Sequence, residues 1–303
     1  MTVGILGHPW LRHLRLPFNL LLAPIFLFGA TAATAVSGAA APLCAPDFWI
    51  AFASVHLFLY GGATAFNSFY DRDQGPVGGM LEPPAVDPGL LRFSLLVQAA
   101  GLLLAALVGA GFTATYLVMA AISVAYSHPA VRLKAHPILA IVAIAVGQGM
   151  LGFVLGWSAV APLVGLASAA TLGRMAVTAS VVTALYLVTQ SYQTVEDRVR
   201  GDLTLPVLLG PGNALRIAVA ILMPAGVGLA VDLVRWAGPL VAAGSIAGLL
   251  GLSGWLLSWG ANFDETATIP NFWRAMRVTT VASGLFGLLM LMLLALGPAG
   301  GAP

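Results

Sequence analysis

Long apolar stretches alternate with short polar loops along almost the whole chain. A transmembrane helix needs about 20 predominantly apolar residues. Nine stretches meet this requirement: 17–38, 48–70, 90–110, 112–127, 138–160, 175–195, 214–234, 237–259 and 276–297. Only Gly109-Ala-Gly-Phe112 separates the third from the fourth, which predicts a tight antiparallel pair. The pattern therefore predicts an all-α, polytopic membrane protein with nine transmembrane helices in a single domain, residues 1–303.

Composition agrees with this interpretation. The 303 residues are 59% hydrophobic and only 8% charged, whereas an ordinary soluble domain is about 25% charged. No basic tract occurs, so nothing in the sequence points to nucleic acid as a partner. The single cysteine, Cys44, has no second cysteine with which to form an internal disulfide.

The distribution of basic residues predicts the orientation. If the N-terminus is cytoplasmic, only Arg174 and Arg235 lie on the far side. The remaining basic residues then share the cytoplasmic side: Arg12, Arg15, Arg72, Arg92, Arg132, Lys134, Arg198, Arg200, Arg216, Arg274 and Arg277. Eleven against two is a strong positive-inside bias. We expect an integral protein of the bacterial inner membrane whose active site faces the cytoplasm.

Acidic residues are concentrated in two clusters on that predicted side. Of eleven acidic residues, five lie in 67–75 and 193–202, at the ends of the second and sixth apolar stretches. Carboxylates beside hydrocarbon are costly and are usually functional. The clusters are separated by about four helices, which hints at a duplicated four-helix unit, 17–127 and 138–259. Residue identity between these halves is weak.

The first cluster ends a polar stripe on the second predicted helix. Spacing of 4-3-4-4 places on one face His56, Tyr60, Ala63, Asn67 and Asp71. Asn67 and Asp71 can present two oxygens to one ion, and Asp73 follows as the helix ends. Oxygen ligands favour a hard cation, here Mg²⁺. The alternative is a helix cap in which Asp71 pairs with Arg72.

The second cluster has helical spacing on the cytoplasmic extension of the sixth stretch. Positions i, i+3, i+4 and i+7 are Gln193, Glu196, Asp197 and Arg200, and Asp202 follows Gly201. We expect these four side chains to share one helical face. Glu196 and Asp197 are adjacent, so they point about 100° apart on a helix. The alternative is an exposed helix end in which Arg198 and Arg200 form salt bridges.

A basic loop lies between the clusters. It runs Tyr126-Ser-His-Pro129-Ala-Val-Arg132-Leu-Lys134-Ala-His136-Pro137. An arginine can fork onto phosphate oxygens and a lysine supplies a point charge. Arg132 and Lys134 are therefore candidates for binding a phosphorylated substrate. Ordinary positive-inside anchoring is the alternative.

Taken in order, these motifs resemble the UbiA-type intramembrane prenyltransferases over nearly the whole chain. The matching positions are Asn67 and Asp71, then Tyr126, Ser127, Pro129, Arg132 and Lys134, then Asp197, Gly201, Thr204, Leu205 and Gly210. The opening His13-Leu-Arg15-Leu-Pro17 is also similar to the start of that family. Two positions depart from its pattern. Asp73 comes early, and Gln193 stands where an acid is expected, so Glu196 or Asp202 would have to supply the charge.

The resemblance implies nine helices around a central cavity and transfer of a prenyl group from a prenyl diphosphate. The implied acceptor is lipophilic, for example an aromatic quinone precursor, and membrane lipid surrounds the site. Two Mg²⁺ ions would be held by residues among Asn67, Asp71, Asp73, Glu196, Asp197 and Asp202. The implied catalytic residues are Asp71, Asp197 and Lys134. The implied substrate-binding residues are Arg72, Tyr126, Arg132, Lys134, Gln193 and Arg198.

Two other functions remain open. An allylic cation without an acceptor can close on itself, which would make the protein a terpene cyclase of the same fold. An ion-coupled transporter or binding protein would also use acidic residues. Transporters, however, usually place coupling charges near the membrane midplane. Here the carboxylates lie at one face, which argues against transport.

Overall fold

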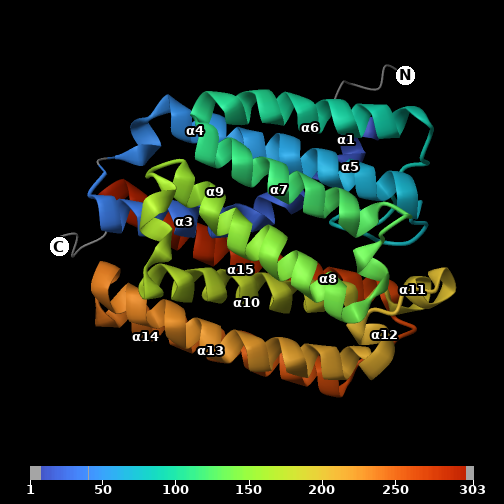
Figure 1. Cartoon of the computed structure of the whole chain (residues 1–303). Coiled ribbons are helices and arrows are strands. Elements are labelled where there is room, and N and C mark those ends of the chain that lie inside the picture. The colour runs from blue at the N-terminus through green and yellow to red at the C-terminus, as the bar shows by residue number, and fades with distance from the viewer. Residues whose placement is uncertain (1–7, 40, 298–303) are drawn as a thin grey trace.

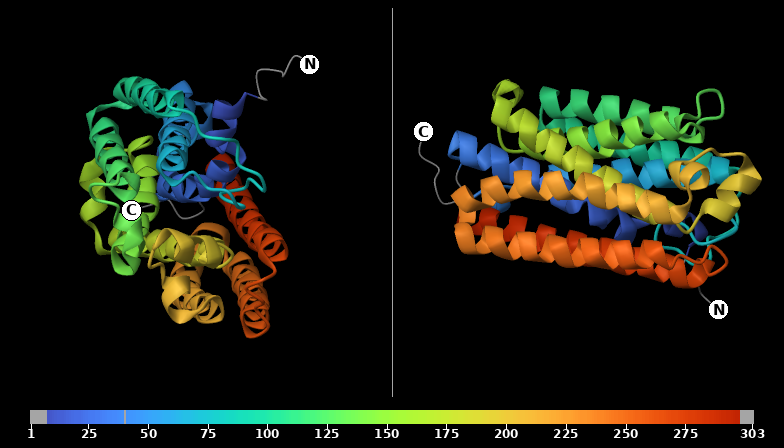
Figure 2. Two further views of the ribbon diagram at one scale, coloured as in Figure 1. Left: turned by 90° about the vertical axis from the view of Figure 1, so that its right-hand side faces the viewer. Right: turned by 90° about the horizontal axis from the view of Figure 1, so that it is seen from below.

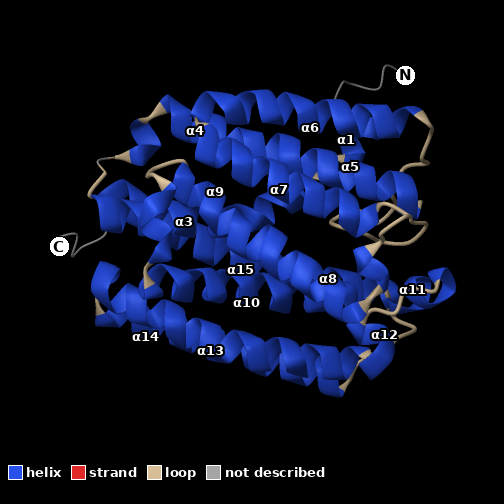
Figure 3. Ribbon diagram, in the orientation of Figure 1, coloured by secondary structure: helices blue, strands red, loops and turns tan. Residues whose placement is uncertain are grey.

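The computed structural model describes residues 8–39 and 41–297, and helices account for most of them. Figure 3 shows helices and loops with no strand in these ranges. The helices are α1 Pro9–His13, α2 Leu16–Asn19, α3 Ala23–Ser37, α4 Pro46–Ala53, α5 Tyr60–Asp71, α6 Gly89–Val108, α7 Ala110–Ser127, α8 Pro137–Ile144, α9 Gly152–Ser158, α10 Ala169–Gln190, α11 Thr194–Arg200, α12 Leu205–Leu209, α13 Pro211–Ala237, α14 Pro239–Ala261 and α15 Thr268–Leu296. This confirms the predicted all-α class.

Nine helical stretches in the described residues are long and apolar enough to cross a membrane, as predicted. Three of them are composite: Pro9–Ser37 contains α1, α2 and α3, Pro46–Asp71 contains α4 and α5, and Pro137–Ser158 contains α8 and α9. Most boundaries match the predicted ones within a few residues, but the first stretch begins at Pro9 rather than at 17. The sixth stretch is displaced, because it spans Ala169–Gln190 rather than 175–195. The ninth begins at Thr268 rather than at 276, because polar Thr268 and Asn271 belong to its first turns.

The long helices run side by side, so their connections lie at two opposite ends of the bundle (Figure 1). One end gathers α11, α12, and the loops that follow α5 and α7 (Figure 1, right). The left view of Figure 2 looks directly onto this end, and the right view shows the bundle from below. Both predicted acidic clusters and the basic loop therefore lie at one end, although they come from three separate parts of the chain.

Apolar side chains cover the outside of the bundle as well as its core. Leu96, Leu103 and Leu107 on α6 are each about 70% exposed. Such exposure suits a helix whose solvent is lipid rather than water. Helices α13 and α14 pack against each other and α13 packs on α10, so this pair extends the bundle on one side. The cavity described below lies away from this pair and is lined mainly by α5, α7, α10 and α15.

Helices α3 and α9 cross with their backbones in close contact. A Cβ placed on Gly29 would lie 2.0 Å from the Phe153 carbonyl oxygen, and one on Gly156 would lie 1.8 Å from that of Phe26. Small residues allow membrane helices to approach this closely. The crossing holds the first and fifth spanning stretches together beside the cavity.

Two interruptions of helical regularity change the predicted faces. The segment Ser54–Leu59 between α4 and α5 is π-helical, and a π turn shifts the register of everything before it. Tyr60, Asn67 and Asp71 share the cavity-facing stripe, whereas His56 is buried and is absent from the cavity wall. Its ring instead stacks on Phe52 with centroids 4.2 Å apart. His56 also contacts the Tyr60 ring, with centroids 5.5 Å apart, so it packs in the core beside the stripe without reaching the cavity.

A turn separates the second motif from the sixth spanning stretch. The α10 helix ends at Gln190, and α11 begins at Thr194 with Gln193 as its N-cap residue. The predicted continuation of the sixth stretch to 195 is therefore wrong, although Glu196, Asp197 and Arg200 do lie on one helix. Instead, the turn at 191–193 gives α11 a direction of its own, and Figure 1 shows it lying across the end of the bundle.

Candidate functional site

A cavity opens at the end where the acidic clusters meet and extends into the bundle. Its charged lining residues are Arg15, Asp71, Asp73, Lys134, Asp197, Arg200 and Asp202. Deeper in the bundle its walls become apolar and aromatic, with Leu22, Tyr60, Met119, Ile144 and Leu185 among the lining residues. The cavity thus combines a charged mouth with a hydrophobic interior.

Asn67 and Asp71 face the cavity one helical turn apart on α5. The amide nitrogen of Asn67 donates a hydrogen bond to the Ser127 hydroxyl oxygen at 3.0 Å, which leaves the amide oxygen free to accept. Asp71 Oδ2 forms an ion pair with the Lys134 ammonium. The motif on α5 and the basic loop after α7 are therefore in direct contact.

Arg200 is the centre of the second half of the site. Its Nη2 donates to Asp197 Oδ1 at 2.9 Å, and its Nη1 forms an ion pair with Asp73. The Thr204 hydroxyl donates to the other oxygen of Asp197 at 3.2 Å. Because Asp73 follows α5 and Asp197 lies on α11, Arg200 joins the two acidic clusters.

Two further arginines complete the ionic network. Arg132 forks onto Asp202, with Nε 3.1 Å from Oδ1 and Nη2 3.0 Å from Oδ2. Arg15 lies 3.5 Å from Asp73 Oδ2, and also donates to the Ser68 hydroxyl oxygen at 2.8 Å. Each carboxylate at the mouth of the cavity therefore has a basic partner.

The structure does not bring every predicted residue to the cavity. Arg72 is exposed, with its guanidinium 5.9 Å from the centre of the Phe69 ring. Arg198 forms an exposed ion pair with Glu265 at 2.6 Å. Glu196 lies at the rim, where its Oε1 accepts a hydrogen bond from the Gln74 backbone N–H at 3.0 Å.

Asp202 is therefore the acid of the second motif that reaches the cavity in addition to Asp197, whereas Glu196 holds the loop after α5. Gln193 and Tyr126 line the cavity as predicted, and Arg132 reaches it through Asp202. Arg15 and Arg200 were not among the predicted site residues. The sequence could have identified both arginines as site residues, because Arg15 lies in the opening motif and Arg200 lies at i+7 from Gln193.

Three atoms at the mouth of the cavity have unsatisfied hydrogen-bonding capacity. Among the described residues, Asp71 Oδ1 is the only carboxylate oxygen that is buried without a hydrogen-bond partner. Arg132 Nη1 lies 3.7 Å from it. The Nε–H groups of Arg15 and Arg200 are buried donors that also lack partners. Unpaired buried polar groups are costly unless a ligand satisfies them.

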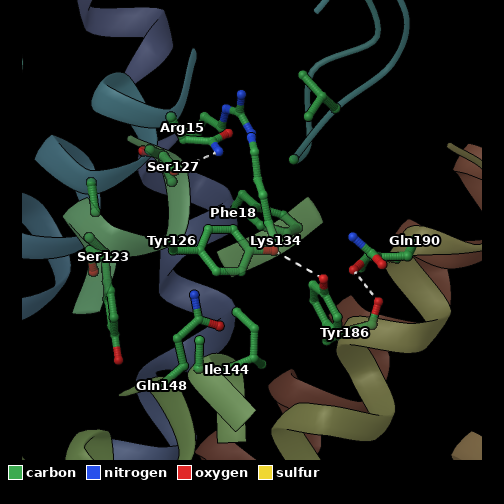
Figure 4. Close-up of a pocket in the computed structure, with 18 of the residues that line it drawn as sticks. Arg15, Phe18, Ser123, Tyr126, Ser127, Lys134, Ile144, Gln148, Tyr186 and Gln190 are labelled. Atoms are coloured by element: carbon green, nitrogen blue, oxygen red, sulfur yellow. Dashed lines mark hydrogen bonds between the residues drawn. The ribbon is translucent and has the colours of Figure 1, made fainter. Parts of the chain in front are cut away.

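Tyrosines line the interior below the charged mouth. The hydroxyls of Tyr126 and Tyr186 lie 3.0 Å apart, and Figure 4 shows the two rings meeting across the cavity. Gln148 lies nearby in the π-helical segment Ala145–Leu151 (Figure 4). Aromatic faces can stabilise a nearby cation while excluding water. The interior therefore suits an apolar ligand that develops positive charge.

Burial also shifts the ionisation of the charged groups. Desolvation raises the pKa of Asp197 to about 6, although its hydrogen bond and ion pair with Arg200 oppose the increase. Desolvation lowers the pKa of Lys134, and the adjacent Asp71 carboxylate opposes this decrease. Perturbed groups of opposite sign in one cavity are typical of a functional site.

A charged mouth above an apolar, aromatic chamber defines the class of this protein as a membrane-embedded α-helical bundle with an internal binding cavity. The chain belongs to the UbiA prenyltransferase family, whose sequence pattern it matches over residues 21–276. The predicted family membership is thereby confirmed.

Solved structures show the same fold. A UbiA homologue from Archaeoglobus fulgidus bound to GPP and Mg²⁺ is similar, with a TM-score of 0.64 and 18% identity over 94% of this chain and 99% of the other. The same homologue bound to DMAPP and Mg²⁺ gives a TM-score of 0.63 and 19% identity with equal coverage. A digeranylgeranylglyceryl phosphate synthase gives 0.55 and 13% identity over 95% and 97% of the two chains. No curated protein matches the sequence significantly.

Proposed function

We propose that the protein transfers a prenyl group from a prenyl diphosphate to a lipophilic acceptor inside the membrane. The observation that carries this proposal is the continuity between the charged mouth and the apolar, aromatic cavity. A prenyl diphosphate has the same two parts, a highly charged head and an apolar tail. The solved complexes of a UbiA homologue with DMAPP or GPP and Mg²⁺ support this choice of substrate.

The oxygen donors at the mouth fit Mg²⁺ as the cofactor. Asp71 offers an unpartnered carboxylate oxygen, and Asn67 offers an amide oxygen one turn away. Hard cations prefer such ligands. When bound, Mg²⁺ would neutralise charge on the departing diphosphate.

The remaining steps belong to residues of the chain. Lys134 and Arg132 would donate charge-assisted hydrogen bonds to the diphosphate oxygens. Tyr126 and Tyr186 would face the allylic cation formed when the carbon–oxygen bond breaks. The apolar walls would keep water from trapping that cation before the acceptor reacts.

The orientation and the acceptor follow from the same features. The positive-inside bias supports a cytoplasmic position for the charged mouth, where a water-soluble diphosphate head would be delivered and released. An acceptor that dissolves in lipid would enter between helices. An aromatic acceptor would donate π electrons to the cation and then lose a proton.

The proposal is tested with purified protein in lipid nanodiscs, Mg²⁺ and prenyl diphosphates of several chain lengths. We expect release of diphosphate from at least one donor, and loss of that release when Mg²⁺ is chelated. Arg216→Gln is the matched control, since this arginine is exposed on α13. Failure of every donor to release diphosphate would contradict the proposal. Product analysis with and without an aromatic acceptor separates transfer from cyclisation.

The raised pKa of Asp197 predicts a pH dependence. Above pH 6 this carboxyl is ionised and can hold the Arg200 guanidinium, whereas below pH 6 it becomes neutral. Diphosphate release should therefore fall as the pH decreases through about 6. The measurement is the release rate at saturating substrate from pH 5 to 8. Any residual activity of Asp197→Asn should lack this transition, and an unchanged profile in that variant would contradict the assignment.

A further inference from the structure

The hydrogen-bonding state of each carboxylate oxygen at the mouth limits how many cations the site can hold. Asp197 uses Oδ1 for Arg200 and Oδ2 for Thr204. Asp202 uses both oxygens for Arg132. Asp73 pairs with Arg200 through Oδ1 and with Arg15 through Oδ2.

Asp71 differs from these three carboxylates. Its Oδ2 contacts Lys134, while Oδ1 is buried without a hydrogen-bond partner and the side chain is only 7% exposed. Asn67, one turn away, has its amide oxygen free. Among the carboxylates of the described residues at the mouth, only Asp71 thus presents a buried oxygen without a hydrogen bond, and the free amide oxygen of Asn67 lies one turn away on α5.

We propose that this site binds a single divalent cation, at Asn67 and Asp71, and that the Arg200 guanidinium takes the place of a second. This inference rests on the proposed prenyl transfer, and it revises the two ions that the family resemblance implied. Gln193 supports it, because a neutral amide stands where an acid would be needed to attract a second ion to Asp197.

The position of Arg200 agrees with this role. Its guanidinium lies between the two acidic clusters, bonded to Asp73 and Asp197 and 3.6 Å from Asp202 through Nε. A divalent ion bound to Asp197 would therefore lie beside a fixed positive charge, and the repulsion would be strong in this buried setting. An arginine also remains charged at all relevant pH values.

Arg200 is also equipped to receive the leaving group. Its Nε–H is a buried donor without a hydrogen-bond partner, with Nε 3.6 Å from Asp202 Oδ2, and the Nε–H of Arg15 also lacks a hydrogen bond. Both residues line the cavity. When the allylic carbon–oxygen bond breaks, the electron pair stays on the diphosphate oxygen and the positive charge stays on carbon. The two Nε–H groups would donate to that diphosphate, while the acceptor supplies the electrons of the new bond and releases a proton.

The number of bound ions tests this inference directly. Protein in nanodiscs is titrated with Mn²⁺ in the presence of saturating inorganic pyrophosphate, and bound Mn²⁺ is counted by electron paramagnetic resonance. We expect one ion per chain for the wild type and for the Arg216→Gln control. Two ions per chain in the wild type would overturn the inference.

Variants test whether the ion binds at Asp71 and whether Arg200 replaces a second ion. Asp71→Asn should abolish Mn²⁺ binding, whereas Gln193→Asp combined with Arg200→Gln should raise the count to two. Arg200→Lys should keep one ion, because a cation remains. If the double variant does not fold, as judged by size-exclusion chromatography, the number of Mn²⁺ ions bound by the wild type still tests the inference. Retention of a bound ion in Asp71→Asn would also overturn the inference.

Turnover in the same preparations separates this inference from the proposed function. Release of diphosphate with two bound ions overturns the single-ion site and leaves prenyl transfer standing. One bound ion with no release from any donor contradicts prenyl transfer, and the count still supports the single-ion site.

Discussion

Replacing Asp71 by asparagine is expected to lower diphosphate release by about 1,000-fold or more. The substitution keeps the size of the side chain but removes the charge of the only carboxylate with an unpartnered buried oxygen in the described cavity. It also leaves the buried Lys134 ammonium without its ion-pair partner. Loss of one strongly placed electrostatic contact commonly costs about 100- to 1,000-fold in rate, and here two are lost.

The measurement is the initial rate of diphosphate release in nanodiscs at saturating donor and Mg²⁺. Asp47→Asn is the matched control, because Asp47 is exposed in the first turn of α4, at the opposite end of the bundle (Figure 1). That control should retain the wild-type rate. Activity of Asp71→Asn within tenfold of wild type would show that Asp71 is not needed for ionisation of the donor.

Gly156→Ala is expected to prevent folding of the bundle. The added Cβ would lie 1.8 Å from the Phe26 carbonyl oxygen and 2.9 Å from the Phe26 Cα. These are backbone atoms, so no rotation of a side chain relieves the clash, and the α3–α9 crossing must separate. Overpacking of a core usually costs about 1–3 kcal/mol of folding free energy. A clash with backbone atoms at this distance should cost at least the upper end of that range.

The measurement is the yield of monodisperse protein after detergent extraction, with the temperature of unfolding for whatever is recovered. Gly254→Ala on α14 is the control, since a Cβ there meets no atom within 4 Å, and it should match the wild type. Recovery of Gly156→Ala at wild-type yield and stability would mean that α3 and α9 are not packed as closely as described.

Much of the architecture could be predicted because the lipid bilayer acts on short, local stretches of sequence. A span must be apolar over about 20 residues, so hydropathy alone located the nine spanning stretches of the described residues, although some of their ends are displaced by several residues. The two acidic clusters and the basic loop were equally visible, since charges are rare in such a chain. The duplicated four-helix unit stays a prediction.

Side-chain direction at the charged end was harder to predict, because it depends on where helical regularity ends. His56 lies in a π-helical segment and does not reach the cavity that Asn67 and Asp71 line. Arg72 ends α5 in a left-handed conformation with φ of 52°, which turns the chain so that Asp73 reaches Arg200. Periodicity assumes an uninterrupted helix, so it fails at such positions.

The sequence by itself determined the membrane-spanning pattern, the sorting of charges to one side, and the set of oxygen and nitrogen groups available for a charged ligand. Only the tertiary structure decided how those groups pair. Arg15, Arg132 and Arg200 approach the carboxylates from 58 to 127 residues away in sequence. The pairing decides which oxygen remains free for a cation, and it depends on the directions of α5, α11 and the loop after α7. No local pattern encodes those directions, because they result from how the helices pack against one another.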